Sequence, residues 1–176
     1  PRQVGDNAFV YDYEEFVGYV RILGEAIKGI EAPVEVVVKP HPSNDYGAIR
    51  EVFEGAGIER WSISPEPIYA FLKETDLVVS LYSTVSFMAA MAGIPVAMLN
   101  TSTHEVINEW NMTEELYKGL TFFIDDPLEL PKRFKEIVDI ALERRRTGAP
   151  WDGDIDHLRR FYPDGAMERC MERLTI

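Results

Sequence analysis

The stretch DLVVSLYSTVSFMAAMAGIPVAML, residues 76–99, contains two short apolar runs on either side of a segment rich in small residues. Residues 76–81 and 95–99 are short, apolar and partly β-branched, which is typical of buried strands. Ser83 is placed to open a helix over residues 85–92, and Gly93 is placed to end it. A strand, a helix and a second strand in this order predict a parallel βαβ unit.

Helices alternate with short buried strands along most of the chain. Further helices are predicted over residues 13–30, 46–54, 64–75, 103–116, 127–146 and 165–174, and further strands over residues 34–39, 58–63 and 120–124. The helix over 64–75 is expected to begin with Ser64 as its N-cap and Pro65 at its first position. The alternation predicts an α/β fold, a Rossmann-like parallel sheet with helices on both faces.

Composition limits the classes of function. The chain has 176 residues, of which 46% are hydrophobic, and this suits a single domain over residues 1–176. A formal charge of −12 argues against nucleic acid or anionic lipid as a partner, because both require clustered Lys and Arg. No apolar run is long enough to cross a bilayer. The single cysteine, Cys170, fits a reducing cytoplasm, and no zinc-type ligand spacing is present.

The first residues carry neither an initiator Met nor a strand. A fold of this class normally opens with a strand. We therefore expect the chain to be a piece of a longer protein, and we expect the N-terminal domain of that protein to be missing from this piece.

The first candidate site follows the predicted strand over residues 34–39. Lys39 is followed by His41, which lies between Pro40 and Pro42, so the imidazole has little conformational freedom at a strand end. Ligands bind at the carboxyl ends of strands in open α/β sheets. His41 is suited to donate to a phosphate oxygen or to transfer a proton, and the alternative is a histidine that only caps the turn.

The second candidate site is the junction Ser80–Val85, where a strand ends and a helix begins. Free N–H groups at a helix N-terminus attract anions, and the hydroxyls of Ser83 and Thr84 add donors. The alternative is that Ser83 or Thr84 is only an N-cap. Asn100 follows the strand over residues 95–99 and is expected to face the same crevice, although a plain polar loop is an equal alternative.

A short basic run, Arg144-Arg145-Arg146, ends the predicted helix over residues 127–146. Cations are favoured at a helix C-terminus, and we expect these side chains to be solvated.

Four segments together resemble the C-terminal domain of GT-B-fold glycosyltransferases: VVVKPHP at 36–42, PIYAFLKETDLVVS at 67–80, STV at 83–85 and GIPV at 93–96. The His-Pro pair and the Ser-Thr pair are most similar to the bacterial sialyltransferase, polysialyltransferase and capsule Kdo-transferase group. CDP-glycerol glycerophosphotransferases have a similar pattern. The tail DGAMER at 164–169 also resembles the end of such proteins.

The resemblance implies that His41 contacts the donor phosphate or nucleotide and that Ser83 and Thr84 bind the phosphate. Lys39, Pro42, Ser80, Val85 and Asn100 are expected to complete the donor site. Transfer in this fold requires no metal or other cofactor. The catalytic base of the family lies in the N-terminal domain, so the expected partners are a nucleotide-sugar donor, that domain and an acceptor glycan.

One position departs from the pattern. Many GT-B enzymes have a Glu that binds the donor ribose at the position of Met88, and a thioether is a poor hydrogen-bond acceptor. This favours a CMP- or CDP-linked donor over the common UDP or GDP mode.

Two other functions share the architecture. A sugar-nucleotide epimerase-like enzyme would need acidic residues in the crevice, where Glu66 is the only nearby candidate. A non-catalytic module that binds a nucleotide sugar or a protein is favoured by Met88.

Overall fold

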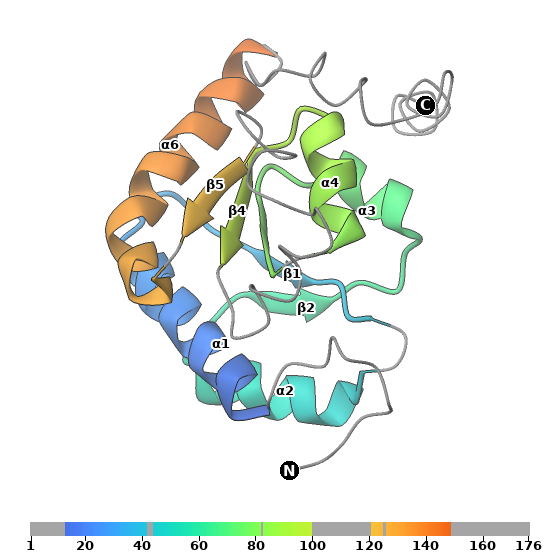
Figure 1. Cartoon of the computed structure of the whole chain (residues 1–176), viewed down its shortest axis with the longest axis vertical. Helices are drawn as coiled ribbons and strands as arrows, with labels where there is room; N and C mark the ends of the chain where they lie inside the picture. Colours follow the sequence, from blue (N-terminus) through green and yellow to red (C-terminus); the bar gives the residue numbers. More distant parts are fainter. Residues whose placement is uncertain (1–12, 42–43, 82, 100–120, 125, 149–176) are drawn as a thin grey trace, which may run out of the picture. The chain divides into compact units, whose positions relative to one another are not determined.

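The computed structural model describes residues 13–41, 44–81, 83–99, 121–124 and 126–148 (Figure 1). The chain forms two compact units. The first comprises residues 1–65 and 127–135, and the second comprises residues 66–126 and 136–176. The helices predicted over 103–116 and 165–174 lie outside the described residues.

The first unit contains the helices α1 (Tyr13–Lys28) and α2 (Tyr46–Gly55), the strands β1 (Val36–Val38) and β2 (Trp61–Ile63), and the short 3-10 helix η1 (Pro127–Glu129). β1 and β2 pair in parallel. Val36 and Val38 of β1 pack against a core that is built around Val20 of α1 and Phe53 of α2. The Phe53 ring packs on Trp61 of β2, with ring centroids 5.3 Å apart.

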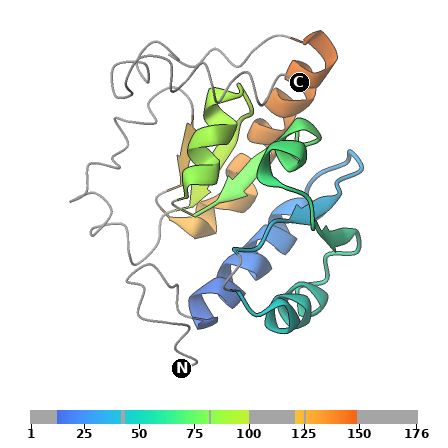
Figure 2. The ribbon, with the colours of Figure 1, turned by 90° about the vertical axis from the view of Figure 1, so that its right-hand side faces the viewer.

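The second unit contains the helices α3 (Ile68–Lys73) and α4 (Thr84–Met91) and the strands β3 (Val78–Ser80), β4 (Val96–Leu99) and β5 (Thr121–Ile124). The strands form a parallel sheet in the order β3-β4-β5. α6 (Leu130–Thr147) begins in the first unit and continues into the second from Glu136. α4 lies over β3 and β4 (Figures 1 and 2).

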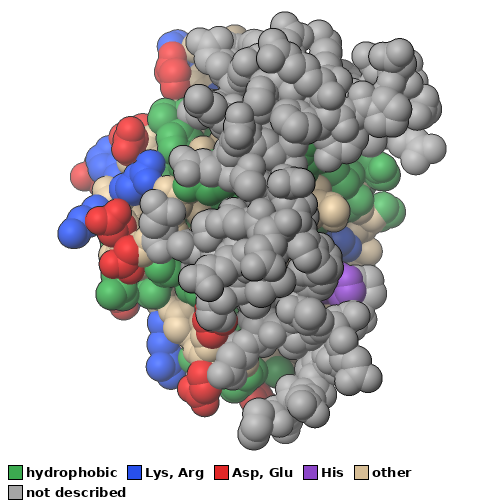
Figure 3. Space-filling model, in the orientation of Figure 1, with side chains coloured by type: hydrophobic (Ala, Val, Ile, Leu, Met, Phe, Trp, Pro, Cys, Tyr) green, Lys and Arg blue, Asp and Glu red, His purple; other side chains and the backbone are tan. Residues whose placement is uncertain are grey.

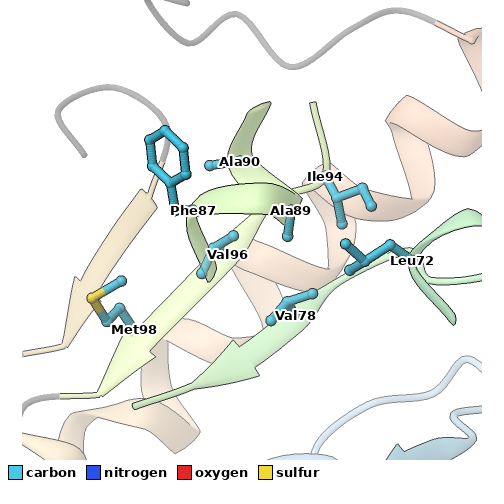
Figure 4. Packing of buried hydrophobic residues seen from close by; sticks show 8 residues of the cluster. All are labelled: Leu72, Val78, Phe87, Ala89, Ala90, Ile94, Val96 and Met98. Carbon is cyan, nitrogen blue, oxygen red and sulfur yellow. The ribbon is translucent and has the colours of Figure 1, made fainter. Parts of the chain in front are cut away.

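Small side chains bring α4 close to the strands. Ala89 and Ala90 of α4 are fully buried in one cluster with Val78 of β3 and Val96 of β4 (Figure 4). All four residues of β4 are buried. Because alternate side chains of a strand point to opposite faces, both faces of β4 are covered.

The end of α4 is fixed by a glycine. Gly93 has φ +69°, a left-handed conformation that favours glycine. Its N–H donates to Ala90 O at 2.9 Å, and the Ile94 N–H donates to Ala89 O at 2.9 Å. This pair of hydrogen bonds is the Schellman motif, so the helix ends where the sequence predicts.

The α/β class and the parallel pairing of the strands are confirmed. The described strands pair as two small sheets, where the sequence predicts one. A single domain over residues 1–176 stays a prediction.

The predicted start of the helix over 64–75 is wrong. α3 begins at Ile68, after Pro67. The Ser64 N–H donates to Val38 O at 2.9 Å, so Ser64 continues the pairing of β2 with β1 instead of capping a helix. Glu66 precedes Pro67, and a residue before proline is disfavoured in helical conformation.

We expect Gly24→Ala to destabilise the protein. A Cβ on Gly24 of α1 would lie 2.8 Å from the backbone oxygen of Ala56, which follows α2. The helices would have to move apart, at a cost of about 1–3 kcal/mol. Urea denaturation followed by circular dichroism measures this change.

Gly18→Ala is the matched control, because a Cβ on Gly18 in the same helix meets nothing within 4 Å. Alanine has the higher helix propensity, so this variant should gain about 0.5–1 kcal/mol. Equal effects of the two substitutions would contradict the close packing of α1 at Ala56.

Candidate functional site

The turn between β3 and α4 places Ser83 as the helix N-cap. Ser83 has an extended backbone, with φ −157° and ψ 146°, and its Oγ accepts the Val85 N–H at 3.1 Å. Its carbonyl oxygen accepts the Ser86 N–H, also at 3.1 Å. Capping at Ser83 is therefore confirmed, and it uses the N–H groups of Val85 and Ser86. A capping oxygen that accepts one N–H still has its own proton to donate.

Ser86 holds this turn from inside. Its side chain is fully buried, and its Oγ lies 2.5 Å from Ser80 Oγ and 3.3 Å from Leu81 O. A carbonyl oxygen can only accept, so the Ser86 hydroxyl donates to Leu81 O and the Ser80 hydroxyl donates to Ser86. The end of β3 is thereby tied to the first turn of α4.

This arrangement gives Ser80 an internal partner. Its hydroxyl proton is directed to Ser86, and the predicted contact of Ser80 with a ligand stays a prediction. Sequence reasoning missed Ser86. The available signal was its place three residues after the N-cap, where a buried serine needs a partner.

The N-terminal end of α4 keeps donors that can face a ligand. Thr84 is exposed, and among the described residues its N–H has no acceptor. The Ser83 and Thr84 hydroxyls stand beside this N–H. α4 has no acidic residue in its first turn, so nothing on the helix itself neutralises its positive end. The arrangement is suited to bind an anionic oxygen.

The second predicted loop follows β1 in the first unit. The His41 N–H donates to Asn44 Oδ1 at 2.8 Å, and the Asn44 N–H donates to His41 O at 2.9 Å. These bonds close a tight turn through the backbone of His41, and the His41 side chain is exposed. Lys39 is half-buried, and its Nζ donates to Ser64 O at 3.5 Å.

Directly after this turn, Asp45 caps α2. Its Oδ1 accepts the N–H groups of Gly47 and Ala48, at 2.8 and 3.2 Å. Hydrogen bonds therefore fix the backbone on both sides of Asn44: those with His41 before it, and those of the Asp45 cap after it.

The structure brings Ser80, Ser83, Thr84 and Val85 together at one turn of the second unit. Lys39 and His41 belong to the first unit. Pro42 and Asn100 lie outside the described residues. Met88 is half-buried and packs against the core under α4, so it contributes to packing.

Charge on the visible surface is mixed. On the face shown in Figure 3, acidic and basic side chains of the described residues are interspersed. Within the described ranges, no three His, Cys, Asp or Glu residues gather where they could hold a metal. In the same part of the chain, none of the helices has the length and apolar composition needed to span a bilayer.

Comparisons of the chain with family models, with curated proteins and with solved structures gave no match.

Ser86→Ala should lower the free energy of unfolding by about 1–3 kcal/mol, because it removes a buried hydroxyl and leaves the Leu81 carbonyl and Ser80 hydroxyl without this partner. Thr84→Ala, at the exposed position two residues earlier, should cost less than about 0.5 kcal/mol. Chemical denaturation of both variants provides the comparison. A loss at Ser86 no larger than that at Thr84 would show that the hydroxyl link contributes nothing to stability.

Proposed function

We propose that this chain is the donor-binding domain of a glycosyltransferase of the GT-B type, with a Rossmann-like fold. It would transfer a sugar or glycerol phosphate from a CMP- or CDP-linked donor, in the synthesis of a surface polysaccharide or glycoconjugate. The observation that carries the proposal is the N-terminal end of α4. It directly follows a parallel strand, it presents the Thr84 N–H with the Ser83 and Thr84 hydroxyls, and its first turn has no acidic residue.

The chemistry of transfer explains why such a helix end is useful. When a glycosyl bond to a nucleotide breaks, negative charge grows on the leaving phosphate. Fixed N–H and O–H donors stabilise that charge, and a placed donor can contribute roughly 3–4 kcal/mol of barrier lowering. A backbone turn held by Ser80 and Ser86 keeps these donors in position without reorganisation.

His41 and Lys39 complete the proposal through the resemblance of their motif. His41 is exposed on a closed turn, and an imidazole can donate to a phosphate oxygen or a nucleotide. The Lys39 ammonium would add a positive charge near the same strand end. The acceptor and the catalytic base are assigned to an N-terminal domain.

A second candidate is a non-catalytic module that binds a nucleotide sugar. It is favoured by Met88, whose side chain packs against the core where many GT-B enzymes have a ribose-binding Glu. Such a module would bind a nucleotide and show no turnover when it is joined to its N-terminal domain, which separates it from the transferase.

A thermal-denaturation panel with CMP, CDP, UDP, GDP and ADP tests the proposal. A ligand that binds only the folded state at about 100 times its Kd adds about 2.7 kcal/mol of stability. We expect a saturable rise in Tm with CMP or CDP. His41→Ala and Ser83→Ala should reduce that rise, because each removes a predicted phosphate contact.

Stability without ligand separates binding from folding. His41→Ala should leave the ligand-free Tm unchanged, because the side chain is exposed, whereas Ser83→Ala should lose about 1 kcal/mol with its cap. Ser62→Ala, an exposed hydroxyl on β2, is the control that should change neither quantity. If none of the five nucleotides gives a saturable rise in Tm, the proposed donor site is contradicted.

A further inference from the structure

The three arginines at the end of α6 have different environments. Arg145 forms an ion pair with Asp76 at 2.5 Å, and Arg146 forms one with Glu143 at 2.6 Å. Hydrogen bonding to Arg146 lowers the pKa of Glu143. Both of these arginines are exposed, as the sequence predicts for the run. Arg144 is half-buried, so the expectation that all three are solvated is wrong for this residue.

The Arg144 guanidinium has more N–H donors than the described residues provide acceptors for. Its Nη2 donates to Ala92 O at 3.4 Å, at the C-terminal end of α4. Its Nε is buried and has no acceptor among the described residues. A guanidinium has five N–H donors, and a buried donor without an acceptor is unfavourable.

Arg144 also lines a half-open cavity of about 180 Å³. It is lined by Leu72, Lys73, Thr75, Ala92, Ile94 and Arg144, all in the second unit. The volume is far above the roughly 15 Å³ that one water requires, so the cavity can admit a polyatomic ion.

The lining carries positive charge and no negative charge. Lys73 and Arg144 are its two charged residues, and neither has a carboxylate partner in the part of the chain that the structure describes. The carbonyl ends of α3 and α4 offset part of this charge, since a helix C-terminus is worth about half a negative charge. Two full cations exceed that amount, in a chain whose formal charge is −12.

We propose that this cavity binds a small tetrahedral oxyanion, such as inorganic phosphate or the phosphate group of a phosphomonoester. The oxyanion would pair with the Arg144 guanidinium and with the Lys73 ammonium, the two cations of the lining. This site goes beyond the donor site, because it lies at the C-terminal end of α4 and the donor site lies at the N-terminal end. An eight-residue helix is about 12 Å long, so one phosphate cannot occupy both sites.

Titration with inorganic phosphate at constant ionic strength, followed by ¹H–¹⁵N NMR, tests the proposal at the Arg144 guanidinium. The Arg144 Nε–H resonance, assigned through Arg144→Lys, should shift in a saturable manner together with the Thr75 and Gly93 amides. Lys73→Gln should weaken the affinity roughly tenfold or more while the fold is retained, because Lys73 is exposed. Lys132→Gln, an exposed cation of α6 that does not line the cavity, is the matched control and should bind phosphate like the unaltered chain.

The outcomes are distinguishable from those of the donor site. Ser83→Ala should leave the Arg144 response unchanged. A response confined to residues 83–86 would overturn the cavity proposal and leave the donor site standing. A shift of Arg144 that grows linearly without saturation, or that falls equally in Lys73→Gln and Lys132→Gln, would show charge screening only and would also overturn it.

Discussion

Close packing of α4 on β3 and β4 is the constraint on which both candidate sites depend. Ala89, Ala90 and Val96 leave no exposed surface between the helix and the strands. The connections of α4 are short, since β3 ends at Ser80, α4 runs from Thr84 to Met91, and β4 begins at Val96. The Ser80–Ser86 link fixes the first connection, and the Schellman motif at Gly93 fixes the second. Both ends of α4 are consequently held in place by hydrogen bonds, and each has a candidate anion site.

Local placement of charge explains how a chain of net charge −12 can have anion sites. Electrostatic interactions between exposed charges weaken over about 10 Å in salt solution, whereas donors at the site act directly. The first turn of α4 has no acid, and the acids near the end of α6, Asp76 and Glu143, are paired with Arg145 and Arg146. The favourable potential is therefore local, as the sequence requires of any anionic ligand.

The βαβ unit over residues 76–99 could be predicted because its signals are local. A run of apolar residues, a capping serine and a terminating glycine act within a few residues of themselves. The start of α3 could not be predicted from Ser64 and Pro65, because the Ser64 N–H is used by Val38, 26 positions earlier in the sequence. Strand pairing is a long-range property, and local capping preferences carry no information about it.

In the candidate site, too, local features could be predicted from the sequence, and contacts between distant residues could not. Ser83 as N-cap follows from the sequence, whereas the partner of Ser86 does not, because it depends on the distance to Ser80 across the turn. Arg144 could not be separated from Arg145 and Arg146, since the three differ only in what α6 packs against.

The proposed donor site requires that the N-terminal end of α4 receive a nucleotide phosphate. The most direct measurement is a CMP titration in which the backbone amide shifts are followed residue by residue by NMR. We expect Thr84, whose N–H has no acceptor among the described residues, to show the largest saturable change, with smaller changes at Ser83 and Val85. Saturable binding of CMP that leaves the amides of residues 83–86 unchanged would contradict it.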